Sequence, residues 1–227
     1  MKNTYKNIII RYSVATAGLV LVAIGVALSI ISDLGTSPIS CLPYVLSLWG
    51  GLTVGEFTAL MHLFFIILQI ILLRRRFRME NLMQILAAVV FGGLTDLAIW
   101  GTSWIVAATY IGKASLMLLS IVITAAGISI EVRAHAWMLA GEMTVAAISD
   151  VTGYKFRNVK IIFDVVLVAI SAITAYIIFR NPLGNGTEVV IREGTLASAL
   201  LTGLFMKFID PVTEKIFGGI IDRYQDR

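Results

Sequence analysis

Long apolar runs that are nearly free of charge constrain this chain more than any other feature. Val14 to Ile31, Ile85 to Trp100 and Ile161 to Phe179 are examples, and about 20 such residues suffice to cross a bilayer as a helix. Only 14% of the 227 residues are charged, against about 25% in a soluble domain. The sequence therefore predicts a single all-α membrane domain over residues 1–227. The six expected transmembrane helices lie near residues 12–31, 53–73, 82–107, 114–131, 159–179 and 194–218.

The distribution of Lys and Arg predicts how these helices are oriented. Lys2, Lys6 and Arg11 precede the first apolar run, as in a signal peptide, but no small-residue cleavage site follows, so we interpret the run as a membrane helix. Positive residues recur at 74–78 and 155–160 and near the C-terminus. Cytoplasmic loops are enriched in such residues. We therefore expect both termini in the cytoplasm, with the connection at residues 32–52 on the outer side.

Composition argues against several functional classes. Cys41 is the single cysteine and there are two histidines, so we expect no intramolecular disulfide and no metal site or other cofactor. No glycine-rich phosphate loop occurs, and the +4 net charge follows membrane topology rather than forming a nucleic-acid patch. No Ser/His/Asp constellation stands at a useful spacing, so we do not expect an enzyme.

A shift of 102 residues aligns the chain weakly with itself. Gly25, Ser47 and Gly51 fall on Gly127, Ser149 and Gly153, while Asp33 falls on His135 and His62 on Asp164. Each repeat, about 12–107 and about 114–218, would hold three helices. An odd number of helices inverts the second copy, the plan of many secondary transporters. Chance alignment of apolar helices is the alternative.

The connector "SDLGTSPISCLPYVLSLWGG" (32–51) is too apolar for a water-exposed loop. Gly35, Pro38 and Pro43 are expected to break a spanning helix. We predict that residues 36–49 form a re-entrant or broken half-helix, with Thr36 or Ser37 as its N-cap. Its free N–H groups would attract an anionic group. The second connector, 132–158, is expected to enter from the opposite face. The alternative is an amphipathic helix lying on the bilayer surface.

Several stretches resemble the YczE/YitT-like bacterial integral membrane proteins, in particular the YczE-type branch. They are "GVALSIISDLGTSPISCLPYVLS", "GLTVGEFT", "LLRRRF", "FGGLTD", "AGEMTVAAISDVTGYKFRNVKIIFDVVLV" and "VIREGTLASALLTG". The likeness covers about residues 12–210, and "LGTSPIS" and "REGT" are its more specific parts. Ala140 stands where the family pattern leads us to expect proline. The resemblance implies a multi-pass protein of the bacterial cytoplasmic (inner) membrane and names no substrate.

Ionisable residues inside a membrane need a partner or a function. We expect one central polar cavity lined by Asp33, Thr36, Ser37, His62, His135, Glu142 and Asp164. His62 with Asp164 is the pair expected to carry a coupling proton. The alternative is that acids such as Asp33, Glu131 and Asp164 lie at helix ends and pair with Arg133, Lys155 or Lys160; for Glu131 and Asp96 this is favoured. Gln69 and Gln84 are expected to bond between helices.

These features favour a small-solute secondary transporter that works by alternating access around the two connectors and couples to protons. The sequence leaves the direction of transport open, and export is one of the two options. A channel or lipid scramblase would use the same broken helices, and a non-transporting assembly or regulatory factor is a third class. The expected partners are the lipid bilayer and a small molecule or ion of unknown identity, without nucleic acid. The sequence leaves a homodimer open.

Overall fold

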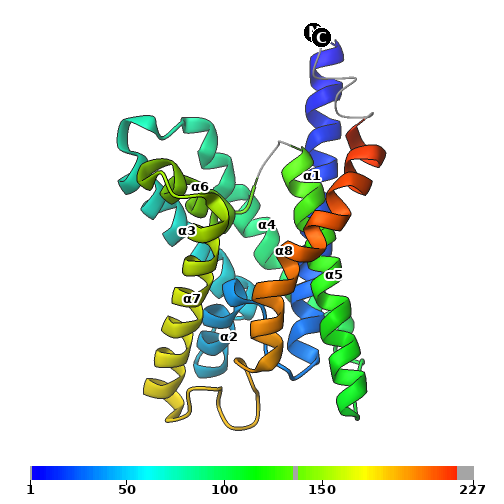
Figure 1. Cartoon of the computed structure of the whole chain (residues 1–227), viewed down its shortest axis with the longest axis vertical. Coiled ribbons are helices and arrows are strands. Elements are labelled where there is room, and N and C mark those ends of the chain that lie inside the picture. The colour runs from blue at the N-terminus through cyan, green and yellow to red at the C-terminus, as the bar shows by residue number, and fades with distance from the viewer. Residues whose placement is uncertain (1, 135–137, 219–227) are drawn as a thin grey trace.

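The computed structural model describes residues 2–134 and 138–218, and it is all-helical over these ranges (Figure 1). The α-helices are α1 (Lys2–Ile31), α2 (Pro38–Trp49), α3 (Val54–Leu73), α4 (Met83–Thr102), α5 (Tyr110–Ala134), α6 (Ala140–Thr152), α7 (Phe156–Phe179) and α8 (Glu193–Thr213). Short 3-10 turns, η1 (Arg74–Arg76) and η2 (Met79–Leu82), join α3 to α4, and a π turn, η3 (Glu214–Gly218), follows α8. Six of the helices are long and apolar enough to cross a membrane. This confirms the predicted helical class and describes a multi-pass membrane protein.

The observed helix ends differ most from the predicted ones at the start of α1, which begins at Lys2 rather than near residue 12, and at the end of α4. The prediction extended this helix to residue 107, but it ends at Thr102. Side-chain donors occupy its last carbonyl groups: Ser103 Oγ donates to Trp100 O at 2.8 Å and Trp104 Nε1 donates to Gly101 O at 2.8 Å. These bonds satisfy carbonyls that would otherwise need a further helical turn.

Close glycine contacts join α1 to α5, the two helices whose spans are the most buried in the bundle. A Cβ added to Gly18 would lie 2.8 Å from Gly127 O, and one added to Gly127 would lie 2.7 Å from Gly18 O. Gly25 likewise faces Thr124, whose Oγ1 would be 2.1 Å from an added Cβ. Small residues allow membrane helices to pack backbone against backbone, so these glycines set the distance between α1 and α5.

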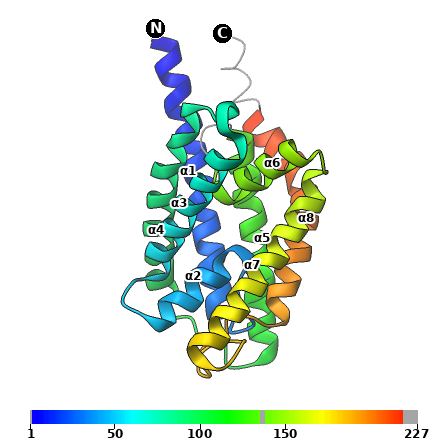
Figure 2. The ribbon, with the colours of Figure 1, turned by 90° about the vertical axis from the view of Figure 1, so that its left-hand side faces the viewer.

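The two short helices pack across the bundle: α2 lies against α7, and α6 lies against α3. Figure 1 shows α2 in the lower half of the molecule and α6 in the upper half. The first turns of α2 and α6 meet, since a Cβ added to Gly141 would lie 2.3 Å from Ile39 Cδ1. Figure 2 shows the beginning of α1, the end of α8 and helix α6 towards the same end of the bundle.

Large apolar side chains cover the outer surface of the bundle. On α3, Phe64 is 60% exposed and Ile71 is 62% exposed, and on α8, Leu200 is 70% exposed. Soluble proteins rarely expose apolar patches of this extent. The surface therefore suits contact with lipid chains.

Candidate functional site

Helix α2 begins as the sequence predicts. Pro38 occupies its first turn and Ser37 is the N-cap residue, although the Ser37 side chain donates to Ser40 Oγ at 2.9 Å rather than capping the helix. Gly35 has φ +97°, and a Cβ there would lie 2.4 Å from Thr195 Oγ1. Pro38, Ser40 and Cys41 are buried, so α2 is not a helix lying exposed on the bilayer surface.

Pro43 does not break the chain as predicted, because it lies inside α2. Its ring nitrogen cannot donate to the Ile39 carbonyl, which removes one helical hydrogen bond. Tertiary packing compensates: the next turn buries Tyr44 and Val45 in a cluster with Ala175 of α7. The break in the connector is thus made by Gly35 and Pro38.

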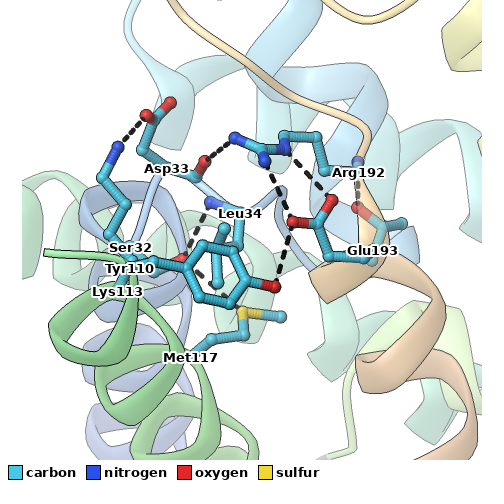
Figure 3. A network of polar contacts seen from close by, with 9 residues as sticks. Ser32, Asp33, Leu34, Tyr110, Lys113, Met117, Arg192 and Glu193 are labelled. Carbon is cyan, nitrogen blue, oxygen red and sulfur yellow. Dashed lines mark hydrogen bonds and ion pairs between the residues drawn. The ribbon is translucent and has the colours of Figure 1, made fainter.

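A network of polar contacts, which we call the outer network, holds the end of α1 against α5 and α8 (Figure 3). Lys113 Nζ of α5 lies 2.5 Å from Asp33 Oδ2, and Arg192 Nη1 donates to Asp33 O at 3.1 Å. Arg192 also pairs with Glu193 at 3.0 Å. The Asp33 and Lys113 side chains are 37% and 27% exposed. Asp33 is therefore part of a half-exposed clasp, and its ion pair with Lys113 is separate from the ion pairs that join Glu142 and Asp164 to Lys160.

The segments "LGTSPIS" and "REGT", distant in sequence, meet beside the outer network. Gly194 N donates to Leu34 O at 2.8 Å, and Thr36 N donates to Val190 O at 3.0 Å. Thr36 is fully buried, and its hydroxyl group lies 2.8 Å from Ser29 Oγ. The Thr36 side chain thus joins the connector to α1. Its predicted role in a central cavity has no support in these contacts.

A second group of charged residues, the inner cluster, lies between α6 and α7. Lys160 Nζ is 2.9 Å from Asp164 Oδ1 and 3.9 Å from Glu142 Oε1. Glu142 Oε2 is buried without a hydrogen-bond partner, and the Asp164 side chain is only 8% exposed. The structure therefore brings two of the predicted site residues together through Lys160. The sequence predicted Lys160 only as an alternative partner for the acids. The signal was its position four residues before Asp164, because residues at this spacing are neighbours on one face of a helix.

His62 of α3 is 1% exposed and does not pair with Asp164 as predicted. Its Nδ1 lies 2.8 Å from Thr58 O, one turn earlier, while its Nε2 is buried without a hydrogen-bond partner. The ring meets Phe65 and Phe91 edge-on at centroid distances of 6.1 and 5.7 Å. No hydrogen bond or ion pair joins His62 to Asp164 within the described residues, because each side chain bonds one turn away on its own helix.

The predicted bond between Gln69 and Gln84 is confirmed, and it is reciprocal. Gln69 Nε2 donates to Gln84 Oε1 at 3.0 Å, and Gln84 Nε2 donates to Gln69 Oε1 at 3.1 Å. Gln69 Nε2 also reaches Ala140 O and Thr144 Oγ1, each at 3.1 Å. This buried group therefore ties the first turn of α6 to both α3 and α4, which the sequence did not reveal.

Other acids stabilise helix ends. Asp96 accepts hydrogen bonds from Gly55 N at 2.8 Å and Thr53 Oγ1 at 2.5 Å, so it holds the start of α3 through these groups rather than through the Arg or Lys partner that the favoured interpretation named. Glu131 is buried and accepts from Leu139 N, the residue before α6. His135 lies outside the described residues.

The predicted site residues thus form separate groups of contacts: the outer network, the inner cluster and His62 share no hydrogen bond or ion pair among the described contacts. No group of three or more His, Cys, Asp or Glu residues in the described ranges could hold a metal ion. The arrangement offers two groups of ion pairs and two helix N-termini, which suits binding and conformational change.

Comparison with known proteins covers nearly the whole chain. The chain is similar to the uncharacterized protein YyaS of Bacillus subtilis (strain 168), with 26% identity over 208 residues, which are 91% of this chain and 96% of the relative. No solved structure matches the chain. These matches do not include the YczE/YitT-like group by name. The profile of a family of unknown function, DUF6198, matches residues 9–211, and the chain therefore belongs to that family.

Proposed function

We propose that the chain is a small-solute secondary transporter of the bacterial cytoplasmic membrane, built from two inverted halves, α1–α4 and α5–α8. Mirrored contacts support the inversion. Gly25 meets Ser120 and Thr124, and Gly127, which follows Gly25 by 102 residues, meets Gly18 and Val22. The two partners on α5 follow the two partners on α1 by the same 102 residues. A two-fold axis between α1 and α5 requires this reciprocity.

The observation that carries the proposal is the meeting of the first turns of α2 and α6. Ile39 and Gly141 are in contact and are also 102 residues apart, so they would lie on the axis itself. Half-helices that begin inside a membrane direct free N–H groups and positive dipole ends at the same region. Several secondary transporters bind the acidic group of a solute in this way. An anionic solute is accordingly the favoured class of substrate.

The two halves also differ in a way that alternating access needs. Gly55 of α3 packs on Gly92 of α4, where an added Cβ would lie 2.0 Å from a carbonyl oxygen. The corresponding helices α7 and α8 form no comparable contact over the described residues. In a transporter with inverted repeats, each half can adopt the conformation of the other half. This exchange of conformations opens the solute site to one side of the membrane and closes it to the other. The outer network would close the outer side in the present state.

The inner cluster is the proposed coupling site. Glu142, Lys160 and Asp164 place two carboxyl groups and one ammonium group within ion-pair distance. Ionised groups at that depth are stabilised by one another, by water or by a bound ion. A proton delivered to either carboxyl group would weaken its hold on Lys160 and so link protonation to the packing of α6 on α7. This assignment replaces the pairing of His62 with Asp164.

A test that needs no known substrate measures two conformations directly. Spin labels at Ile111 and Thr187, exposed residues at the end of the bundle that we propose faces outward, report on separation across the outer network in a Cys41→Ala background. We expect two distance populations in liposomes, whose ratio changes with pH. A single distance under all conditions would exclude alternating access. Steady ion conductance or lipid scrambling with that single distance would favour a channel or a scramblase.

Screening would then identify the solute. Proteoliposomes on a solid-supported membrane are exposed to small carboxylates and phosphate esters under a pH gradient, and transient currents are recorded. Asp164→Asn should abolish the currents, whereas Trp104→Phe, at an exposed position 78% accessible, should preserve them. Equal currents from both variants would remove Asp164 from the coupling mechanism.

A further inference from the structure

A pocket of about 560 Å³ opens at the end of the bundle that also contains α6. Its size is in the range of small-molecule sites. It lies between the end of α3, the η1–η2 link and the side of α6. Its lining residues are Leu73, Arg76, Arg78, Asn81, Met143, Ala146, Ala147 and Asp150.

The lining combines phosphate-binding groups with an apolar wall. Arg76 and Arg78 contribute two guanidinium groups, and Asn81 contributes an amide. Guanidinium groups match phosphate oxygens in charge and geometry. Met143 and Leu73 provide apolar surface on the same pocket. A free metabolite phosphate would leave that surface unused, whereas a lipid has a glycerol backbone and acyl chains to cover it.

The position of the pocket points to the same ligand. The α3–α4 link lies at the end of the bundle where α1 begins (Figure 2), which the Lys/Arg bias assigns to the cytoplasmic side. A long apolar helix such as α3 ends at the level of the lipid headgroups. The cytoplasmic leaflet carries anionic lipids, which basic pockets between membrane helices bind.

We propose that this pocket binds the phosphate group of an anionic phospholipid of the inner leaflet. Arg76 and Arg78 hold the phosphate, and the α6 side chains contact the glycerol and upper acyl region. Because α6 forms one wall, bound lipid would join α6 to the end of α3. The site is independent of the transported solute and does not depend on the proposed transport activity.

Purified full-length protein in phosphatidylcholine nanodiscs, doped with a few per cent of phosphatidylglycerol of the same acyl composition, provides the test. Native mass spectrometry counts each lipid that stays bound after release from the disc. The variants are Arg76→Gln with Arg78→Gln, and the control is Arg74→Gln with Arg75→Gln. Both pairs remove two charges from the same basic tract, but only the first pair lines the pocket.

We expect retained phosphatidylglycerol to exceed phosphatidylcholine in the wild type. The double variant Arg76→Gln/Arg78→Gln should weaken this retention about 30-fold, at roughly fivefold per arginine. The control variant Arg74→Gln/Arg75→Gln should change it less than about threefold. Asp150→Asn removes the acidic side chain from the described lining of the pocket and should strengthen retention. A gain of binding cannot come from unfolding, so this variant tests the pocket in a folded protein. Equal loss in both double variants would overturn the proposal, since general surface charge would then explain binding. Displacement of the lipid by millimolar inorganic phosphate at constant ionic strength would also overturn it and assign the pocket to a soluble phosphate.

Discussion

Gly127→Ala tests the central packing of α1 on α5. The added Cβ would lie 2.7 Å from Gly18 O and 2.8 Å from Val22 N, whereas ordinary contact begins at 3.4 Å. The side-chain atom Val22 Cγ2 would also lie at 2.7 Å, but the other two obstructing atoms belong to the backbone, so rotation of a side chain alone cannot relieve the contact. The helices would have to separate by about 0.7 Å. Overpacking of this kind costs up to about 3 kcal/mol.

The net effect must include the higher helix propensity of alanine, which is worth about 1 kcal/mol. We therefore expect Gly127→Ala to lower the free energy of unfolding by about 2 kcal/mol. At about 2–4 °C for each kcal/mol in a chain of this size, the midpoint of thermal unfolding should fall by about 4–8 °C. Scans of the purified protein in one detergent and at one heating rate measure this.

Gly203→Ala is the matched control, because no atom lies within 4 Å of the Cβ it would add to α8. With no obstruction, the propensity gain remains and the midpoint should rise by about 2–4 °C. The two substitutions are chemically the same and should act in opposite directions. If Gly127→Ala raised the midpoint as much as Gly203→Ala, the close approach of α1 to α5 would be wrong, and with it the main support for a two-fold axis there.

Three further predictions follow from individual contacts. Gln69→Leu should lower the free energy of unfolding by about 1–2 kcal/mol, because it leaves the Gln84 side-chain amide buried without either of its bonds to Gln69; an unchanged midpoint in the same scans would contradict this. Cys41, the single cysteine, is fully buried, so maleimide should label it only after denaturation, and rapid labelling of the folded protein would show that α2 lies on the surface. Lys113→Gln should shift the ratio of the two spin-label distances towards the longer one by a measurable factor of up to about fivefold, because the half-exposed ion pair that it removes contributes up to about 1 kcal/mol; no change would mean that the outer network does not close the outer side.

Local chemistry decided the features that the sequence predicted correctly. A run of about 20 apolar residues has few alternatives to a spanning helix, and six such helices are observed. Pro38 is the first residue of α2 because its fixed φ and absent N–H suit a helix start. Gln69 and Gln84 find each other because an amide in a membrane interior has few other partners. These outcomes depend on neighbours in sequence or on a strong penalty for an unmade bond.

The polar pairs depended on the tertiary structure, because spacing along the chain fixes neither helix rotation nor depth. His62 and Asp164 occupy equivalent positions 102 residues apart, yet equivalent residues touch only where they lie on the axis that relates them. Ile39 and Gly141 are in contact, whereas His62 and Asp164 bond to Thr58 and Lys160 on their own helices. Asp33 has φ +53° at the end of α1, and its partners Lys113 and Arg192 come from helices 80 and 159 residues away. Such contacts form when packed helices bring distant side chains together, so the sequence determined the membrane helices and the broken connector, and only the packing decided which charges meet.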